Sequence, residues 1–105
     1  LADNDAGYGM IAPMIRISDN DIYRSGTKIG YIQGNDIWSY DGNKMGYAEG
    51  NSIFNASGKK VAWLQGEYIY TERDRKIRIS DNNQYVSGGD APPAYRAAIR
   101  VLLED

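Results

Sequence analysis

The segment NDIYRSGTKIGYIQG (20–34) is followed by NDIWSYDGNKMGYAEG (35–50) and NSIFNASGKKVAWLQG (51–66), three copies of a unit of about sixteen residues. A fourth, diverged copy, EYIYTERDRKIRISDN, spans 67–82. Lysine recurs every sixteen residues, at Lys28, Lys44, Lys60 and Lys76. A unit of this length cannot bury its apolar side chains alone, so it must pack against its neighbours. The repeat therefore predicts an array of equivalent structural units.

Each unit alternates apolar with polar or small residues, which is typical of β-strands. In the second half of the first unit, Ile29 and Tyr31 alternate with Lys28 and Gly30. In the first half of the four units, an isoleucine faces one side of the strand and an aromatic residue the other. The isoleucines are Ile22, Ile37, Ile53 and Ile69. Gly30 and Gly46 are expected to leave room for an aromatic ring of the neighbouring strand.

Two kinds of turn separate these strands. One kind contains Gly26, Asp41-Gly42, Gly58 and, in the fourth unit, Asp74. The other kind contains Gly34, Gly50, Gly66, Asn82 and Asn20. Glycine replaced only by asparagine predicts a positive φ at this second position. Either kind of turn can form the hairpin tips, and the sequence leaves this choice open.

The two ends of the repeat region suggest how the array closes. The hexapeptide IRISDN occurs at 15–20 and again at 77–82. The chain thus begins with a second-half strand and ends with a first-half strand over 84–86, which gives five strands of each kind, ten in all. Closure would remove the exposed edges of an open sheet. The sequence therefore predicts a mainly β fold, with a closed ring of five β-hairpins over 14–89.

The last segment, 90–105, has the pattern of an α-helix. Asp90 is the expected N-cap, and two prolines follow in the first turn. An apolar stripe at helical spacing comprises Tyr95, Ala98, Ile99 and Leu102. We expect this helix to pack on the ring and cover one mouth of it. The alternative is that it docks a partner or a second copy of the chain. Residues 1–13 are expected to be a loose N-terminal segment.

Composition excludes several classes of function. The chain has 105 residues, a net charge of −2, no cysteine and no histidine. Without cysteine it has neither disulfides nor thiolate ligands, and without histidine it lacks the commonest general base and metal ligand. We therefore expect no enzyme activity, no catalytic residues, no cofactor and no metal. Mixed charge argues against nucleic-acid binding, and no apolar run is long enough to span a membrane.

Aromatic residues are the best candidates for a ligand site. Aromatic rings can stack on sugars, although in a small β-fold their first role is packing. The candidates are Trp38, Tyr40, Tyr23, Phe54 and Tyr70. Trp38 and Tyr40 are expected to be the most exposed of them. The lysine series would attract an anionic polymer or a lipid headgroup, but it also keeps a hairpin array soluble.

The pattern IYRSGTKIGYIQGNDIW, YDGNKMGYAEGNSIF and ASGKKVAWLQG, with IRISDN and the closing AAIRVLLED, resembles the five-fold β-flower family. The resemblance covers residues 14–105. It implies a ring of five β-hairpin petals. It also implies an exported bacterial protein, because the members of the family are short exported proteins that come chiefly from Bacteroides-type bacteria. It implies no activity and no residue roles, because the family has none assigned. The fourth copy departs from the pattern, with Arg73-Asp74-Arg75 in its tip and Arg78 in the glycine position.

These observations lead to two hypotheses about function. The first is a non-enzymatic structural or binding module of the bacterial cell envelope. The second is a carbohydrate- or peptidoglycan-binding module that uses the repeated aromatic residues. The expected partner is accordingly a cell-wall glycan, a protein, or a second copy of the chain bound through the C-terminal helix. The start of the chain without methionine suggests a processed or trimmed protein. Together with the resemblance to exported proteins, it leads us to expect a periplasmic or secreted location.

Overall fold

The computed structural model describes residues 12–104. Its three helical segments are α1 (Ile79–Tyr85), α2 (Pro93–Ile99) and the π-helix η1 (Arg100–Glu104). Its ten strands are β1 (Ile15–Ser18), β2 (Asp21–Arg24), β3 (Thr27–Gln33), β4 (Asp36–Ser39), β5 (Lys44–Glu49), β6 (Ser52–Asn55), β7 (Lys60–Gln65), β8 (Tyr68–Thr71), β9 (Lys76–Arg78) and β10 (Val86–Ser87). The predicted loose segment 1–13 lies almost wholly outside the described residues.

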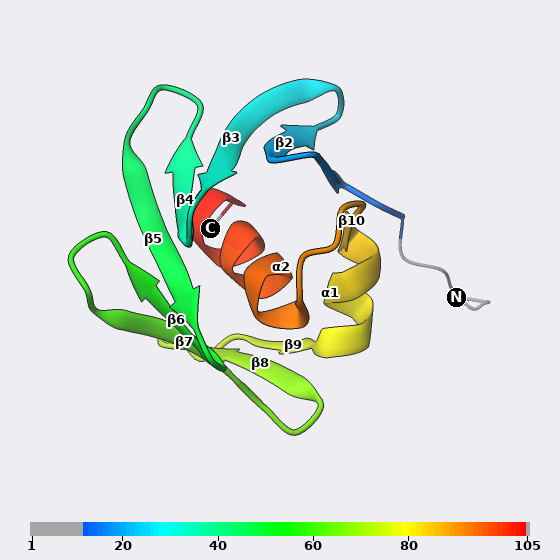
Figure 1. Cartoon of the computed structure of the whole chain (residues 1–105). Helices are drawn as coiled ribbons and strands as arrows, with labels where there is room; N and C mark the ends of the chain where they lie inside the picture. Colours follow the sequence, from blue (N-terminus) through cyan, green and yellow to red (C-terminus); the bar gives the residue numbers. More distant parts are fainter. Residues whose placement is uncertain (1–11, 105) are drawn as a thin grey trace.

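The strands form a single sheet that curls around α2. Strands β1 to β9 lie side by side in chain order, each antiparallel to the next, and β10 pairs with the other edge of β1 in parallel. Strands surround α2 on several sides (Figure 1). We call the strand pairs β2–β3, β4–β5, β6–β7 and β8–β9 the first to fourth hairpins.

The prediction of ten strands is confirmed, whereas the closed ring of five hairpins is not formed. In the described part of the chain, β9 and β10 are the two edges of the sheet and do not pair with each other. They are joined by α1, which stands where a fifth hairpin would close the ring. Both kinds of turn connect antiparallel neighbours, and either choice of tip gives four hairpins among β1 to β9.

The hexapeptide IRISDN adopts a different structure at each of its two places. Residues 15–20 form β1 and a turn, whereas residues 77–82 form the end of β9 and the start of α1. Asn82 is fully buried, and its Oδ1 accepts a hydrogen bond from Arg100 Nη1 at 3.3 Å. Because identical residues have identical propensities, the tertiary contacts decide between strand and helix. The strand predicted over 84–86 is reduced to the two residues of β10.

The inner face of the sheet is built from one isoleucine per hairpin. Their exposed fractions are 1% or less, and they belong to one apolar core with the helix residues Ala97, Ala98 and Ile99. The isoleucines are Ile22, Ile37, Ile53 and Ile69. The isoleucines and the aromatic residues lie on opposite faces, as predicted, and the structure shows that the isoleucines face inward. Burying one isoleucine side chain contributes about 1.5–3 kcal/mol, so this face is a main source of stability.

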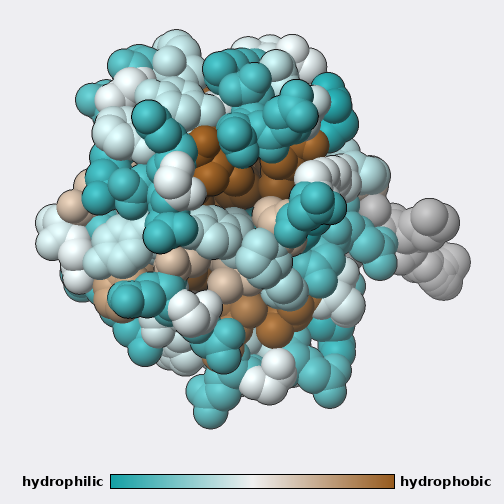
Figure 2. Space-filling view, viewed as in Figure 1, coloured by the Kyte–Doolittle hydropathy of each residue, from teal (hydrophilic) through white to brown (hydrophobic). Residues whose placement is uncertain are grey.

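The C-terminal helix lies inside the curled sheet. It was predicted over 90–105, but α2 begins at Pro93 with Pro92 as its N-cap, and Asp90 makes no cap. Ala97, Ala98 and Ile99 are fully buried, because the sheet wraps around the helix instead of presenting a mouth to be covered. The space-filling view shows apolar side chains in the recesses of one face, surrounded by hydrophilic side chains (Figure 2).

The two strand glycines make room for this helix. A Cβ on Gly46 would lie 2.8 Å from Leu102 Cδ1, and one on Gly30 would lie 3.0 Å from Leu103 Cδ1. Each Cβ would also collide with a carbonyl oxygen of the neighbouring strand, that of Phe54 or Trp38 respectively. The prediction that an aromatic ring uses this space is therefore wrong, because Leu102 and Leu103 use it.

The turn residues follow the predicted backbone pattern in most places. Gly34, Gly50 and Gly66 have φ values of 63°, 60° and 62°, as predicted. In the turn between β1 and β2, the positive φ of 56° belongs to Asp19 and not to Asn20. Asp19 directly precedes Asn20, as Gly34 directly precedes Asn35, so Asp19 is the equivalent position in the unit. Asn82 lies in α1 and is no turn residue.

Candidate functional site

The outer face of the sheet carries three pairs of aromatic rings. Trp38 stacks on Tyr31 with ring centres 6.1 Å apart, and the Tyr47–Phe54 and Trp63–Tyr70 pairs stack at 5.1 and 6.0 Å. The partners of each pair are directly opposite each other on adjacent strands. Such separations between near-parallel rings are typical of offset stacking. Each ring is half-buried and keeps part of its surface toward solvent.

A lysine lies over one ring of each pair. Lys28, Lys44 and Lys60 place Nζ 5.4, 5.5 and 5.7 Å from the ring centres of Tyr31, Tyr47 and Trp63 respectively. Each lysine is three residues before its ring, and the two share a face because a β-bulge between them adds one residue. On β1, the guanidinium carbon of Arg16 lies 5.4 Å from the ring centre of Tyr23. These are cation–π contacts.

The predicted candidates are brought onto this face with one exception. Tyr23, Trp38, Phe54 and Tyr70 are spread in a row across the outer face. Tyr40 is 71% exposed, as predicted, but it lies in the tip of the second hairpin, apart from the row. Trp38 is less accessible than predicted, because its indole Nε1 is buried and has no hydrogen-bond partner among the described residues.

Sequence reasoning missed half of this surface. Tyr31, Tyr47, Trp63 and Tyr68 complete the row. All four are aromatic residues of a repeat strand, and the alternation pattern of the sequence contains that signal. Their partners follow from the strand register, which the repeat alone does not specify.

The recurring lysines of the first two hairpins form ion pairs, whereas those of the last two form none with the described residues. Lys28 Nζ lies 3.0 Å from Asp21 Oδ1, and Lys44 Nζ lies 3.5 Å from Asp36 Oδ1. The hydrogen bond to Asp21 raises the pKa of Lys28 above its usual value. The same position of the unit holds Ser52 in the third hairpin and Tyr68 in the fourth.

The fourth hairpin adds an outward-facing arginine because it lacks the bulge. Ile77 pairs directly with Ile69 and takes the inward position that glycine or alanine occupies in the other hairpins. Arg78 therefore faces outward, donates a hydrogen bond from Nη2 to the Tyr68 hydroxyl at 3.0 Å, and has its guanidinium carbon 5.1 Å from that ring centre. Lys76 Nζ lies 4.1 Å from the same ring centre.

We call the outer surface of the third and fourth hairpins the cationic aromatic patch. It comprises Lys60, Trp63, Tyr68, Tyr70, Lys76 and Arg78. The carboxylate of Glu67, whose side chain is 82% exposed, lies 3.5 Å from Arg78 Nη1. Within the described residues, Lys60 and Lys76 make cation–π contacts but no ion pair.

A groove of about 720 Å³ lies between the tips of the third and fourth hairpins. Its rim includes the arginine-rich tip 71–75, where two arginines alternate with two acidic residues. Glu72 is also paired with Lys59 at 2.9 Å. The apolar floor comprises Met45, Val61, Val101 and Leu102. Because the charges of the rim balance, this groove favours neither sign of charge in a ligand.

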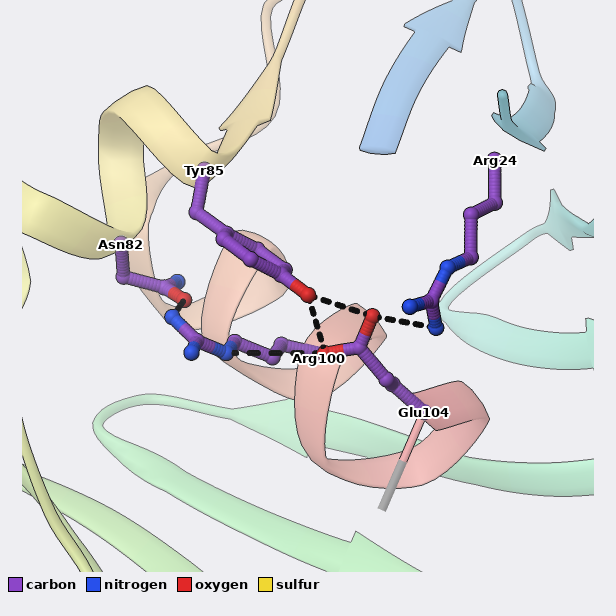
Figure 3. A network of polar contacts seen from close by, with 5 residues as sticks. All are labelled: Arg24, Asn82, Tyr85, Arg100 and Glu104. Atoms are coloured by element: carbon purple, nitrogen blue, oxygen red, sulfur yellow. Dashed lines mark hydrogen bonds and ion pairs between the residues drawn. The ribbon is translucent and has the colours of Figure 1, made fainter. Parts of the chain in front are cut away.

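A polar network fastens the C-terminal turn to the rest of the fold (Figure 3). The carboxylate of Glu104 accepts a hydrogen bond of 2.6 Å from the Tyr85 hydroxyl and pairs with Arg24 at 2.6 Å. The guanidinium of Arg100 lies 3.8 Å from the ring centre of Tyr85 and donates to Asn82. Burial, and then the bond to Glu104, raises the pKa of Tyr85. The network joins η1 to α1 and β2, which gives it a structural role.

Among residues 12–104, no three acidic, histidine or cysteine side chains gather closely enough to hold a metal ion. None of the helices in this range is long and apolar enough to cross a membrane.

Comparison with known proteins identifies the family. The family model described as 4-fold beta flower protein matches residues 9–99. No curated protein and no solved structure matches the chain. The four-fold description agrees with the four hairpins of the structure and differs from the five-fold symmetry that the sequence suggested. The match covers most of the chain, which therefore belongs to the 4-fold beta flower family.

Proposed function

We propose that this protein is a non-enzymatic binding module of the bacterial cell envelope that binds glycans at the outer face of its sheet. The observation that carries the proposal is the row of offset-stacked ring pairs on a solvent-facing sheet, each with a cation beside it. The inner face is filled by the helix, so the outer face is the large surface left for a ligand.

The chemistry of the row suits a sugar. Aromatic rings offer an apolar surface to the C–H face of a sugar ring, and lysine ammonium groups donate hydrogen bonds to its hydroxyls. The pairs are held by strand pairing and by each other, so the surface is already ordered before a ligand arrives. Such preorganisation lowers the entropic cost of binding.

The other two parts of the proposal have separate support. The non-enzymatic part rests on a composition without histidine or cysteine, which removes the usual nucleophile–base pairs. The envelope location rests on the resemblance of the repeat to exported proteins. Fractionation of the source cells with an antibody against the protein tests the location. Recovery with the cytoplasmic fraction would overturn that part.

Retention on immobilised polysaccharides tests the glycan-binding part. We expect the wild type to be retained on cell-wall glycan or another polysaccharide, and Trp63→Ala to reduce affinity about threefold to tenfold, as loss of an aromatic contact does. Trp38→Ala and Tyr40→Ala compare the row with the exposed tip. Tyr95→Phe is the control, because Tyr95 lies on α2 and bonds Asn35 away from the outer face. Absence of retention on every polysaccharide overturns the proposal.

A further inference from the structure

The four hairpins differ in the charge of their outer surface, which the packing of the repeat does not require to be the same in each copy. In the first two hairpins an aspartate sits beside the lysine, whereas Ser52 and Tyr68 replace it in the last two. The fourth hairpin also turns Arg78 outward by losing its bulge. Three cations therefore collect on β7 and β9 of a chain whose net charge is −2. General basic composition does not explain this patch.

We infer that the cationic aromatic patch binds an acidic polysaccharide, with Lys60, Lys76 and Arg78 pairing the carboxylates of its uronic acid units. The inference rests on the proposed glycan-binding function and names its ligand class and its place on the sheet. The sugar rings would lie over Trp63 of β7 and Tyr70 of β8.

The spacing of the cations suits a chain of alternating sugar and charge. β7 and β9 are separated by β8 alone, so their side chains are two strand spacings apart, roughly 10 Å. The aromatic rings fill the interval between them. A polymer that crosses the strands thus meets one cation on β7, then the aromatic surface, and then two cations on β9.

The cations are available to a ligand. Lys60 and Lys76 contact ring faces only, among the described residues, and such exposed contacts are weaker than a charge-assisted hydrogen bond. Arg78 already pairs at 3.5 Å with Glu67, an 82% exposed carboxylate. A uronate would replace the carboxylate of Glu67 by another of the same chemistry.

Charge density favours an acidic glycan over a nucleic acid. Duplex DNA carries one negative charge per about 1.7 Å, and its binding requires many phosphate contacts. Three cations on a chain of net charge −2 cannot neutralise such a polymer. A uronate-containing glycan carries at most one carboxylate per sugar, so the acidic remainder of the surface repels it less.

The decisive variant introduces into the third hairpin the aspartate that the first two hairpins carry at the same position. Ser52→Asp places a carboxylate where Asp36 reaches Lys44, and we expect it to pair with Lys60. Affinity for polygalacturonate should fall about threefold to fivefold, as loss of a surface charge pair does. Lys60→Gln should have the same effect by removing the cation. Added salt should weaken wild-type binding.

Lys59, the residue before Lys60, supplies a matched control variant. Lys59→Gln removes the same charge, but Lys59 pairs with Glu72 in the groove rim and lies outside the patch, so polygalacturonate affinity should be unchanged. All four proteins are compared on polygalacturonate, on neutral dextran and on a DNA duplex by affinity electrophoresis, with circular dichroism to check folding.

The outcomes separate the inference from the proposed function. Preference for polygalacturonate that is lost in Ser52→Asp and Lys60→Gln supports both. Equal binding to dextran and polygalacturonate, unchanged by the variants, overturns the inference and leaves the glycan-binding function standing. Tighter binding to DNA overturns the inference and makes nucleic acid the ligand. Binding to none of the three, nor to cell-wall glycan, overturns both.

Discussion

The same repeat makes the inner and the outer face of the sheet. The residues at equivalent positions of the four copies agree more closely on the inner face than on the outer face. On the inner face each hairpin has an isoleucine at the same position, and all four are at most 1% exposed. On the outer face the equivalent sites vary, from Asp21 and Asp36 to Ser52 and Tyr68. Close packing against one helix requires a side chain of the same shape in each hairpin, whereas exposure to solvent sets no such requirement. Differences between copies therefore point to function, and agreement points to structure.

The largest expected effect is on the inner face. Ile53→Ala should lower the free energy of unfolding by about 2–5 kcal/mol, because it removes buried methyl groups and leaves a cavity against the helix. Urea unfolding followed by circular dichroism measures the loss. Lys60→Gln on the neighbouring strand β7 is the outer-face control, and its free energy of unfolding should stay within about 0.5 kcal/mol of that of the wild type. Equal losses in the two variants would remove the distinction between the faces.

A second inner-face prediction concerns the glycine position. Gly46→Ala should cost about 1–3 kcal/mol, because its Cβ would meet the Phe54 carbonyl and lie 2.8 Å from Leu102 Cδ1. The third hairpin carries Ala62 at this position, fully buried. At Gly46, in contrast, φ is 156°, so the strand backbone and Leu102 both restrict this position.

The double variant Gly46→Ala/Leu102→Ala checks this explanation. If Leu102 causes part of the strain, the double variant should lose less stability than the sum of the two single losses. Strict additivity would assign the whole cost to the strand, that is, to the Phe54 carbonyl and the positive φ of Gly46. Unfolding of the three variants under the same conditions gives the coupling directly.

The repeat predicts the parts of the fold that local chemistry decides. Alternation predicted that Ile37 and Trp38 lie on opposite faces of the strand, and the glycine rule identified the positive φ of Gly34. The C-terminal helix was predicted from its apolar spacing, and Ile99 is indeed buried. Each of these features depends on residues close together in the chain, so the sequence alone contains enough information.

The features that could not be predicted depend on distant contacts. The second IRISDN becomes helical where Asn82 meets Arg100, eighteen residues away. This helix prevents the last hairpin, so the ring stays open. The sequence placed Arg78 in the glycine position, but loss of the bulge turned it outward over Tyr68. A register change of one residue moves a side chain to the other face, and no local pattern announces it.

The polar network that joins η1 to α1 and β2 gives a smaller, pH-dependent effect on stability. Tyr85→Phe removes the hydrogen bond to Glu104 and should cost about 1 kcal/mol at neutral pH. The pKa of Tyr85 is raised in the folded state, so its contribution is complete below the unfolded value of about 10 and is lost as pH rises through the folded value. The difference between the two proteins should therefore shrink above pH 10. Lys28, whose pKa is also raised, is present in both proteins, so its contribution to the pH dependence cancels in the difference between them. A difference independent of pH up to 11 would contradict this assignment.

The smallest expected effect on stability comes from exchanging the outer charges. Asp36→Ser removes an ion pair from the second hairpin, and Ser52→Asp adds one to the third. An exposed pair contributes about 0.2–1 kcal/mol, so the two changes should be small and opposite in sign, measurable as shifts in urea midpoint. Their effect on acidic glycan binding should be the larger one, with Asp36→Ser strengthening it and Ser52→Asp weakening it. If instead the charge exchange alters stability as much as Ile53→Ala while leaving binding unchanged, the outer face is structural like the inner one. The variation between the hairpins would then have no functional meaning.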